Sequence, residues 1–305
     1  MIAHRLLHRL LQHPEGQSRA DLGSVVGMST DALEGLLVAL QAEGVQLQMD
    51  GDRVRLVDAR GAWGPHTLAW RTARPVHHHQ SCPSTNRIAR ELARVTPHGA
   101  PLPVVVADHQ SAGRGRRGRV WSASPGQNLL FSVVLRPALT PADMPRAILA
   151  WAAAMADVLD VSLKWPNDLV VSRGDGYRKL GGILAELETA SSDEVPAIPT
   201  SVVLGVGINV SQTAFEDLPL ATSLALLGRT VIDRAELLGA LVQAIDAVDV
   251  QADDLLDLWR RRACMLGRTV RVGDLVGVAE GIRDDGALMV SGRPVLAGDV
   301  ELISR

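Results

Sequence analysis

Apolar residues recur at helical spacing through the first part of the chain. The leucines of residues 1–13 fall on one face of a helix, and residues 19–44 contain two more helical runs, separated by Gly27. Ser29 or Thr30 is placed to cap the second of these runs. The pattern therefore predicts three short helices at the start of the chain.

The spacing then changes to alternation. Residues 46–57 alternate apolar and polar side chains around an Asp-Gly pair, which is typical of a β-hairpin. Three helices followed by a hairpin predict a winged helix-turn-helix over residues 1–58. Residues 59–75 carry two glycines and two prolines, and this composition predicts a linker.

Residues 76–265 mix the two spacings. Short apolar runs predict strands, and longer amphipathic runs predict helices. The predicted strands are 103–108, 128–135, 163–171, 180–188 and 201–210, and the predicted helices are 141–159, 234–248 and 254–266. Strands outnumber the helices that could connect them in parallel, so we expect an α+β protein with a central mixed α/β domain.

The last part of the chain, residues 266–305, consists of short apolar runs interrupted by Gly-Asp and Asp-Gly turns. This pattern predicts a small β-barrel of the SH3-like type. The sequence thus divides into an N-terminal helical domain, a linker, a central mixed domain and a C-terminal barrel.

Composition narrows the function classes. The chain has 305 residues and a formal net charge of -3, so any attraction for nucleic acid must come from a local patch. The two cysteines, Cys82 and Cys264, have no disulfide-framework or zinc-ligand spacing, and a reducing, cytoplasmic setting is expected. No apolar run approaches the roughly 18 residues that a membrane span needs, so we expect no membrane association.

One loop concentrates positive charge. AGRGRRGRVW, residues 112–121, places four arginines and three glycines in seven consecutive positions. Its glycines satisfy the dinucleotide pattern G-x-G-x-x-G, but that site needs a following helix and an acidic residue about 20 positions later, and neither is present. The chain also lacks Gly-Lys-Ser or Gly-Lys-Thr, which excludes a P-loop. Two interpretations of the loop remain. It is a nucleic-acid patch that includes Trp121, or it closes over a small anionic ligand.

Two further features favour a small polar ligand. Neutral polar side chains at residues 84–86, Gln110 and Asn209 suit hydrogen bonding to a small molecule better than binding to a long polyanion. Of the 31 basic residues only two are lysines, Lys164 and Lys179. An ammonium group is a compact point charge that fits beside a carboxylate or phosphate.

The motifs PSTN, HQSAGRGRRGRVW, KWPNDLVV, RKLGGILAE and VLGVGINV follow one another between residues 83 and 210. In this order and at this spacing they closely resemble those of the biotin protein ligases. The resemblance extends to both ends, because the N-terminal winged helix and the C-terminal small barrel match the bifunctional bacterial ligases that also repress biotin synthesis.

The resemblance implies a two-step reaction. Biotin and ATP form biotinyl-5′-AMP and diphosphate, with Mg²⁺ accompanying ATP, and a lysine of the biotin carboxyl carrier protein of acetyl-CoA carboxylase then takes the biotin. A homodimer formed through the catalytic sheet is a further expectation. The C-terminal barrel is expected to help dock ATP or the carrier protein.

The resemblance also implies the site residues. The biotin end would consist of Ser84, Thr85, Asn86, Gln110, Gly113, Arg114, Gly115, Arg116 and Lys179. The nucleotide end would consist of Arg116, Arg119, Trp121, Lys164, Asn167, Asp168 and Asn209. Lys179 and Arg116 would be the catalytic cations, and Asp168 the carboxylate near magnesium.

Structural roles remain as alternatives for several of these positions. Gly181, Gly182, Gly205 and Gly207 would permit close strand packing, and Asp168 would serve as a turn residue. A lipoate protein ligase and a ligand-sensing regulator without turnover are the alternative functions. The arginine-rich loop favours biotin over lipoate.

DNA is a doubtful partner. Residues 1–58 contain five arginines and eight acidic residues, a formal charge of -3, whereas DNA affinity depends on neutralising phosphates. The expected recognition helix, STDALEGLLVALQAEG, has no basic residue. Arg53 and Arg55 of the hairpin are the wing-like contacts available. We therefore expect this domain to bind DNA weakly or to act structurally.

Overall fold

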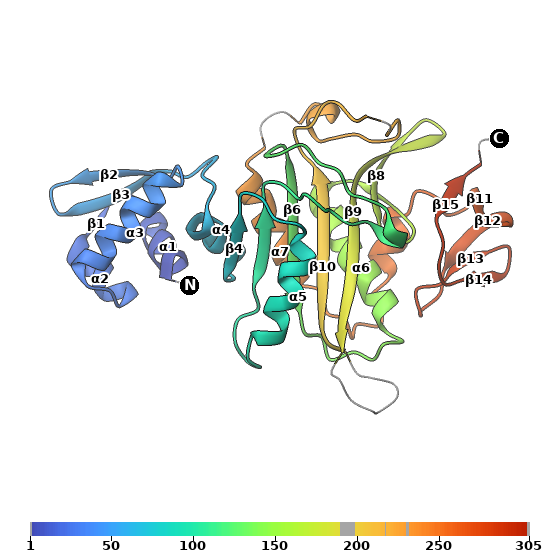
Figure 1. Ribbon diagram of the computed structural model, residues 1–305, viewed down its shortest axis with the longest axis horizontal. Coiled ribbons are helices and arrows are strands. Elements are labelled where there is room, and N and C mark those ends of the chain that lie inside the picture. The colour runs from blue at the N-terminus through green and yellow to red at the C-terminus, as the bar shows by residue number, and fades with distance from the viewer. Residues whose placement is uncertain (1, 190–198, 217, 230–231, 304–305) are drawn as a thin grey trace.

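The computed structural model describes residues 2–303, except for 190–198, 217 and 230–231. Its elements form three groups along the long axis of the molecule (Figure 1). A helical N-terminal group lies at one end, a sheet covered by helices lies in the middle, and a small group of strands lies at the other end.

The N-terminal group contains three helices and a three-stranded antiparallel sheet of order β1-β3-β2. Its elements are α1 (Ile2–Gln12), β1 (Gln17–Ser18), α2 (Arg19–Val26), α3 (Thr30–Ala42), β2 (Gln46–Asp50) and β3 (Arg53–Asp58). Ser29 caps α3 by accepting a hydrogen bond from the Ala32 N–H, and Gly27 ends α2 in the left-handed region at φ 73°. The predicted helices and hairpin are confirmed.

The segment predicted to be a linker contains a helix, α4 (Pro65–Thr72). Pro65 suits the first helical position, and the Glu43 carboxylate accepts hydrogen bonds from the backbone N–H groups of His66 (3.0 Å) and Thr67 (2.7 Å). The composition of residues 59–75 did not predict this helix, because the glycines and prolines of the segment do not indicate one. The capping residue, Glu43, lies 23 and 24 positions before the two residues whose N–H groups it accepts from.

The central group is a seven-stranded sheet of order β4-β5-β6-β10-β9-β8-β7. Among the strand pairs that the described residues form in this sheet, β4 and β5 are parallel and the others are antiparallel, so the sheet is mixed. Its strands are β4 (Val76–His79), β5 (Val104–Ala107), β6 (Asn128–Leu135), β7 (Ser162–Lys164), β8 (Asp168–Arg173), β9 (Gly176–Thr189) and β10 (Pro199–Asn209). The predicted strand at residues 163–171 is in fact the hairpin of β7 and β8.

Helices cover both faces of this sheet. Val104 and Val106 of β5 belong to the large core beneath α6 (Met144–Leu159) and α7 (Arg234–Asp246), while Val105 packs with Ala89 of α5 (Thr85–Val95) on the other face. Such alternation follows from the period of two along a strand. The sequence reading did not predict α5, because most of its side chains are polar.

The predicted C-terminal helix at residues 254–266 is shorter in the structure, as α8 (Asp257–Arg262). Among the described residues no single helix is long and apolar enough to cross a membrane. The pair α2 and α3 passes that test only when the two are joined across a 94° bend.

The C-terminal group is a five-stranded antiparallel sheet of order β14-β13-β12-β11-β15. Its strands are β11 (Thr269–Val272), β12 (Leu275–Ile282), β13 (Leu288–Val290), β14 (Arg293–Val295) and β15 (Val300–Leu302). The β7–β8 hairpin reaches this sheet through two hydrogen bonds. The Trp165 indole donates to Gly286 O (3.1 Å), and Lys164 Nζ donates to Val300 O (3.3 Å).

Candidate active site

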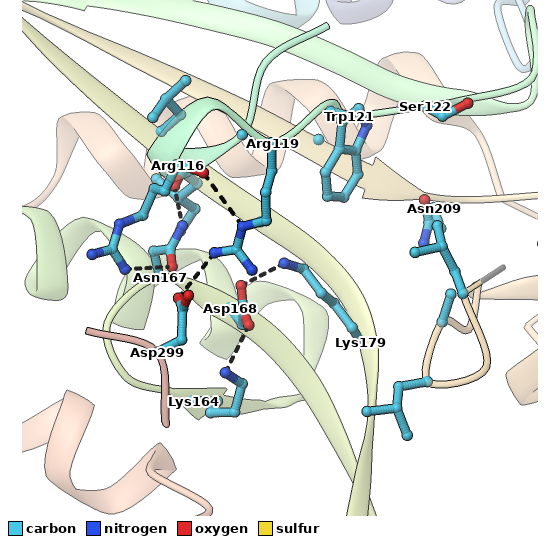
Figure 2. Close-up of a pocket in the computed structure, with 18 of the residues that line it drawn as sticks. Arg116, Arg119, Trp121, Ser122, Lys164, Asn167, Asp168, Lys179, Asn209 and Asp299 are labelled. Carbon is cyan, nitrogen blue, oxygen red and sulfur yellow. Dashed lines mark hydrogen bonds and ion pairs between the residues drawn. The ribbon is translucent and has the colours of Figure 1, made fainter. Parts of the chain in front are cut away.

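A cavity of about 1010 Å³ lies on the face of the central sheet formed by β8, β9 and β10, next to β15. All the predicted site residues except Gly113 line it. Figure 2 shows the basic part of this cavity, where Lys164, Lys179, Arg116 and Arg119 gather around two carboxylates. The structure therefore brings together residues that are separated by more than 100 positions in the sequence.

A β-bulge directs Lys179 into the cavity. Leu169 of β8 pairs with Gly181 of β9, but Val170 pairs with Lys179, so Leu180 has no partner on β8. Residues three apart on a regular strand face opposite sides, and the extra residue places Lys179 on the same side as Gly182. Both residues line the cavity.

Asp168 lies between the only two lysines of the chain (Figure 2). Its carboxylate oxygens are 3.0 Å from Lys164 Nζ and 2.6 Å from Lys179 Nζ. Burial alone would raise the pKa of Asp168, but the two ammonium groups outweigh this effect and hold the pKa below its usual value. The carboxylate stays charged, and the three groups together carry one net positive charge.

The arginine-rich loop folds over the cavity as a small hairpin. Arg114 and Val120 form a β-bridge, and the Gly115 N–H donates to Arg119 O at 2.7 Å. The turn contains Arg117 at φ 56° and Gly118 at φ 75°, both in the left-handed region. Gly113 does not line the cavity but packs against the backbone of Trp121. A side chain at this position would collide with Trp121 O, so the close approach requires glycine.

Each of three loop arginines has a different partner. Arg116 Nη1 donates to Asn167 Oδ1 (3.2 Å), while Arg119 Nη2 lies 2.9 Å from Asp299 Oδ1 (Figure 2). Burial lowers the pKa of Arg116, although it remains a cation near neutral pH. The third arginine, Arg114, lies 3.3 Å from a carboxylate oxygen of Glu186.

At one end of the cavity, called the uncharged end here, the neutral polar side chains of Ser84, Thr85, Asn86 and Gln110 line the wall, and several of them are hydrogen-bonded to one another or to the sheet. Gln110 Oε1 accepts from the Thr85 N–H (2.8 Å) and lies 3.2 Å from Thr85 Oγ1. Ser132 Oγ lies 2.8 Å from Thr85 Oγ1 and 2.6 Å from Asn86 Oδ1, and Asn86 Nδ2 donates to Glu186 Oε2 (2.7 Å). Asn86 therefore has both ends of its amide engaged by the protein, and it supports the wall of the cavity.

Trp121 lies over a floor of glycines. An added Cβ at Gly207 would lie 2.5 Å from the Trp121 ring and one at Gly182 would lie 3.3 Å from it. The Lys179 ammonium is 5.7 Å from the ring centroid. The indole N–H is buried and has no hydrogen-bond partner among residues 2–303 as described. The sequence suggested that four glycines permit close strand packing. An added Cβ at Gly205 would collide with the Asn86 side chain, and one at Gly181 would collide with the backbone of the neighbouring strand, at Gly207 O.

The residues do not fit a protein-held magnesium ion. Within the described part of the chain, no group of three or more His, Cys, Asp or Glu residues could hold a metal. Both oxygens of Asp168 already face ammonium groups, so the expected role of Asp168 near magnesium has no support in this geometry. Magnesium would therefore enter as the counter-ion of a nucleotide.

The sequence reading missed three polar residues of this region. Ser132 lies inside an apolar strand, Glu186 is the last residue of the RKLGGILAE motif, and Asp299 directly precedes β15. Alternation within 180–188 could have placed Glu186 on the face of Gly182. The partners of Ser132 and Asp299 are too distant in the sequence for any local pattern to reveal.

Comparison with known proteins agrees with these features. Residues 79–209 match the biotin/lipoate A/B protein ligase family. The biotin–[acetyl-CoA-carboxylase] ligase of Mycobacterium tuberculosis is 39% identical over 65% of this chain and 77% of its own length. The Escherichia coli protein named bifunctional ligase/repressor BirA is 28% identical over 97% of this chain and 95% of its own length.

Solved structures share the fold. The biotin protein ligase of Aquifex aeolicus, in complex with biotin and ATP, aligns with a TM-score of 0.59 and 24% identity, over 75% of this chain and 99% of that one. These relatives and the matched residues establish that the chain belongs to the biotin protein ligase family, a family of ligases.

Proposed function

We propose that this protein is an ATP-dependent biotin protein ligase. It forms biotinyl-5′-AMP and transfers the biotin to a lysine of the biotin carboxyl carrier protein of acetyl-CoA carboxylase. The observation that carries the proposal is the Lys164–Asp168–Lys179 group, which lies between an uncharged polar end of the cavity and an arginine-rich loop.

In the first step a carboxylate oxygen of biotin attacks the α-phosphorus of ATP. The bond from this phosphorus to the bridging oxygen breaks, and diphosphate leaves. Both reactants are anions, so fixed cations lower the barrier. Asp168 holds Lys179 in place without cancelling the net positive charge, and Arg116 supplies a second cation from the loop. Mg²⁺ that accompanies ATP would supply further charge neutralisation for the departing diphosphate.

In the second step the amine nitrogen of the carrier lysine attacks the acyl carbon of biotinyl-5′-AMP. The amine loses a proton, the bond from the acyl carbon to the phosphate oxygen breaks, and AMP leaves. The same cations stabilise the negative charge that returns to the phosphate. Lys179 and Arg116 therefore serve both steps.

The uncharged end of the cavity suits the urea ring of biotin. Thr85 donates to Gln110 Oε1 and thereby fixes the orientation of the Gln110 amide. The NH₂ group of Gln110 is then the end that can donate to a ligand carbonyl. The dithiolane ring of lipoate has no urea and would leave such polar groups unpaired, which costs binding energy. We therefore infer a preference for biotin over lipoate.

Turnover of the purified protein tests the proposal. ATP and Mg²⁺ are supplied with biotin or with lipoate, diphosphate release is followed, and biotin transfer to a carrier domain is measured by mass. We expect release and transfer that depend on biotin. Tight biotin binding without turnover would favour a sensor instead, and release with lipoate alone would favour a lipoate ligase.

We infer that residues 1–58 are a winged helix and that this domain binds DNA weakly. Relatives named ligase/repressor cover this region, but the outer face of α3 carries exposed Asp31 and Val38 and no basic side chain, and Glu34 is paired with Arg19. Sequence-specific binding in the nanomolar range, in a gel-shift titration with biotin and ATP present, would contradict this inference.

We further infer that the C-terminal sheet is an SH3-like barrel that helps to close the nucleotide end of the cavity. Residues 299–302 line the cavity, and Asp299 pairs with Arg119 of the loop. A homodimer through the central sheet remains a prediction from the family resemblance. Sedimentation of the protein with and without biotin and ATP tests it.

A further inference from the structure

Glu186 connects three separate segments, β9, α5 and the arginine-rich loop, next to the end of the cavity that Ser84, Thr85 and Asn86 line. It lies on β9, and its side chain is mostly buried, with 18% exposed. One carboxylate oxygen accepts from Asn86 Nδ2 (2.7 Å), and the other is 3.3 Å from Arg114 and 3.6 Å from Arg90. These partners come from the start of α5, the arginine-rich loop and the middle of α5.

A continuous line of polar contacts runs from the sheet to the loop through this residue. Ser132 Oγ of β6 is 2.6 Å from Asn86 Oδ1, Asn86 Nδ2 donates to Glu186, and Glu186 faces Arg114. The first contact is buried and the second is partly buried, so the packed sheet holds the geometry of this end of the line. Arg114 is the exposed, movable end of the line, with 59% of its side chain exposed.

We propose that Glu186 is a positioning residue that anchors the arginine-rich loop over the biotin end of the cavity. The proposal rests on the proposed function for its link to biotin, but the anchoring itself is independent of catalysis. Glu186 acts through Arg114 and Asn86.

The far end of the loop has its own anchor. Arg119 pairs with Asp299 of the C-terminal sheet, on the nucleotide side of the cavity. Because the two anchors hold opposite ends, loss of the Glu186 charge should loosen the biotin end more than the nucleotide end. A residue that only supported the fold would disturb both ends alike.

Glu188 provides a matched control. It lies two positions along β9, on the same face as Glu186, and its carboxylate forms ion pairs with Arg90 and Arg94 of α5. A Glu188→Gln variant therefore removes the same charge from the same strand and weakens the contact between β9 and α5. It leaves the ion pair of Glu186 with Arg114 in place.

Limited digestion with trypsin tests the anchoring without any substrate, because trypsin cleaves after the four arginines of the loop. In Glu186→Gln we expect cleavage after residues 114–119, located by mass spectrometry, to be about 5-fold faster than in the unaltered protein, as the loss of one charged hydrogen-bonding partner implies. Glu188→Gln should match the unaltered protein at these bonds. Equal loop cleavage in all three proteins, or equal acceleration in both variants, would overturn the proposal.

Steady-state kinetics of the full chain tests the link to biotin. For Glu186→Gln we expect the KM for biotin to rise about 5-fold while the KM for ATP stays within about 2-fold, since the anchor acts at one end of the loop. A rise in both KM values together would overturn the biotin-end assignment. If the unaltered protein does not release diphosphate with biotin, the proposed function fails, and the digestion still decides whether Glu186 anchors the loop.

Discussion

The cavity and the outer face of α3 use charge in opposite ways. Around the cavity, both lysines of the chain and several loop arginines converge on a small volume, where Lys164 and Lys179 face Asp168 and Arg119 faces Asp299. The outer face of α3 has acidic and apolar exposed residues, including Val38 at 62% exposure, and no basic ones. Although the net charge of the chain is -3, both of its lysines and several of its arginines therefore gather at one cavity.

This difference bears on the two activities in the name ligase/repressor that some relatives carry. Ligase chemistry needs a few fixed cations in a sheltered site, whereas DNA binding needs many cations along an open surface. The cavity contains such fixed cations, whereas residues 1–58 carry five arginines and eight acidic residues. Substitutions at four positions test this comparison. Two of the positions carry charges of the cavity, and at the other two, one in each region, a methyl group is added.

Lys179→Ala should have the largest effect. We expect biotin-dependent diphosphate release to fall about 100- to 1000-fold, because removal of one preorganised charge at a reacting centre has this magnitude. The melting temperature of the variant should change little, since Lys179 lines the cavity and lies outside the apolar core. Lys179→Arg keeps the charge but not the compact shape and should also lose most activity. Release at the unaltered rate in Lys179→Ala would remove this residue from the mechanism.

Asp168→Asn should destabilise the fold by about 3 kcal/mol at pH 7, because it leaves two buried or half-buried ammonium groups without their counter-ion. The lowered pKa of Asp168 gives this difference a pH dependence. The unfolded chain takes up the proton first as the pH falls below about 4, so the stabilisation by Asp168 is present above that pH and is lost below it. Urea unfolding of both proteins from pH 7 to pH 3 measures the effect, and a gap that does not narrow on acidification would contradict the assignment.

Gly207→Ala tests the glycine floor under Trp121. The added methyl group would lie 2.5 Å from the indole, so the ring must move. We expect kcat/KM for ATP to fall about 10- to 100-fold, the order of loss that follows when a binding group is displaced by about 1 Å. Steady-state kinetics at saturating biotin is the measurement. Unchanged ATP kinetics would show that the position of Trp121 is not used by the nucleotide.

Gly35→Ala should have the smallest effect and the opposite sign. Gly35 lies within α3, and an added Cβ would have no heavy atom within 4 Å of it among the described residues. Replacing an exposed glycine within a helix by alanine should stabilise the domain by about 0.5–1 kcal/mol. Chemical denaturation measures this, with biotin turnover expected to be unchanged. A clear loss of turnover would mean that α3 is coupled to the cavity.

Local patterns predicted most of the fold. The helices of the first 42 residues, the hairpin that follows and the long strands of the central sheet all appear where apolar spacing placed them. Two helices were missed, and the reasons differ. The cap of α4 comes from Glu43, outside the segment itself, and α5 is so polar that its buried face is reduced to a few small residues such as Ala89 and Ala93.

The sequence by itself determined which chemical groups are available, since the order of five motifs and the placement of only two lysines already indicated the site. The tertiary structure decided what those groups can do. A bulge at Leu180 turns Lys179 toward Asp168, and packing brings Glu186 and Asp299 to opposite ends of one loop. Spacing along a chain reflects only neighbours within a few residues. Arg114 and Glu186 are 72 positions apart, and Arg119 and Asp299 are 180 positions apart, so these two contacts depend on how the sheets and helices pack.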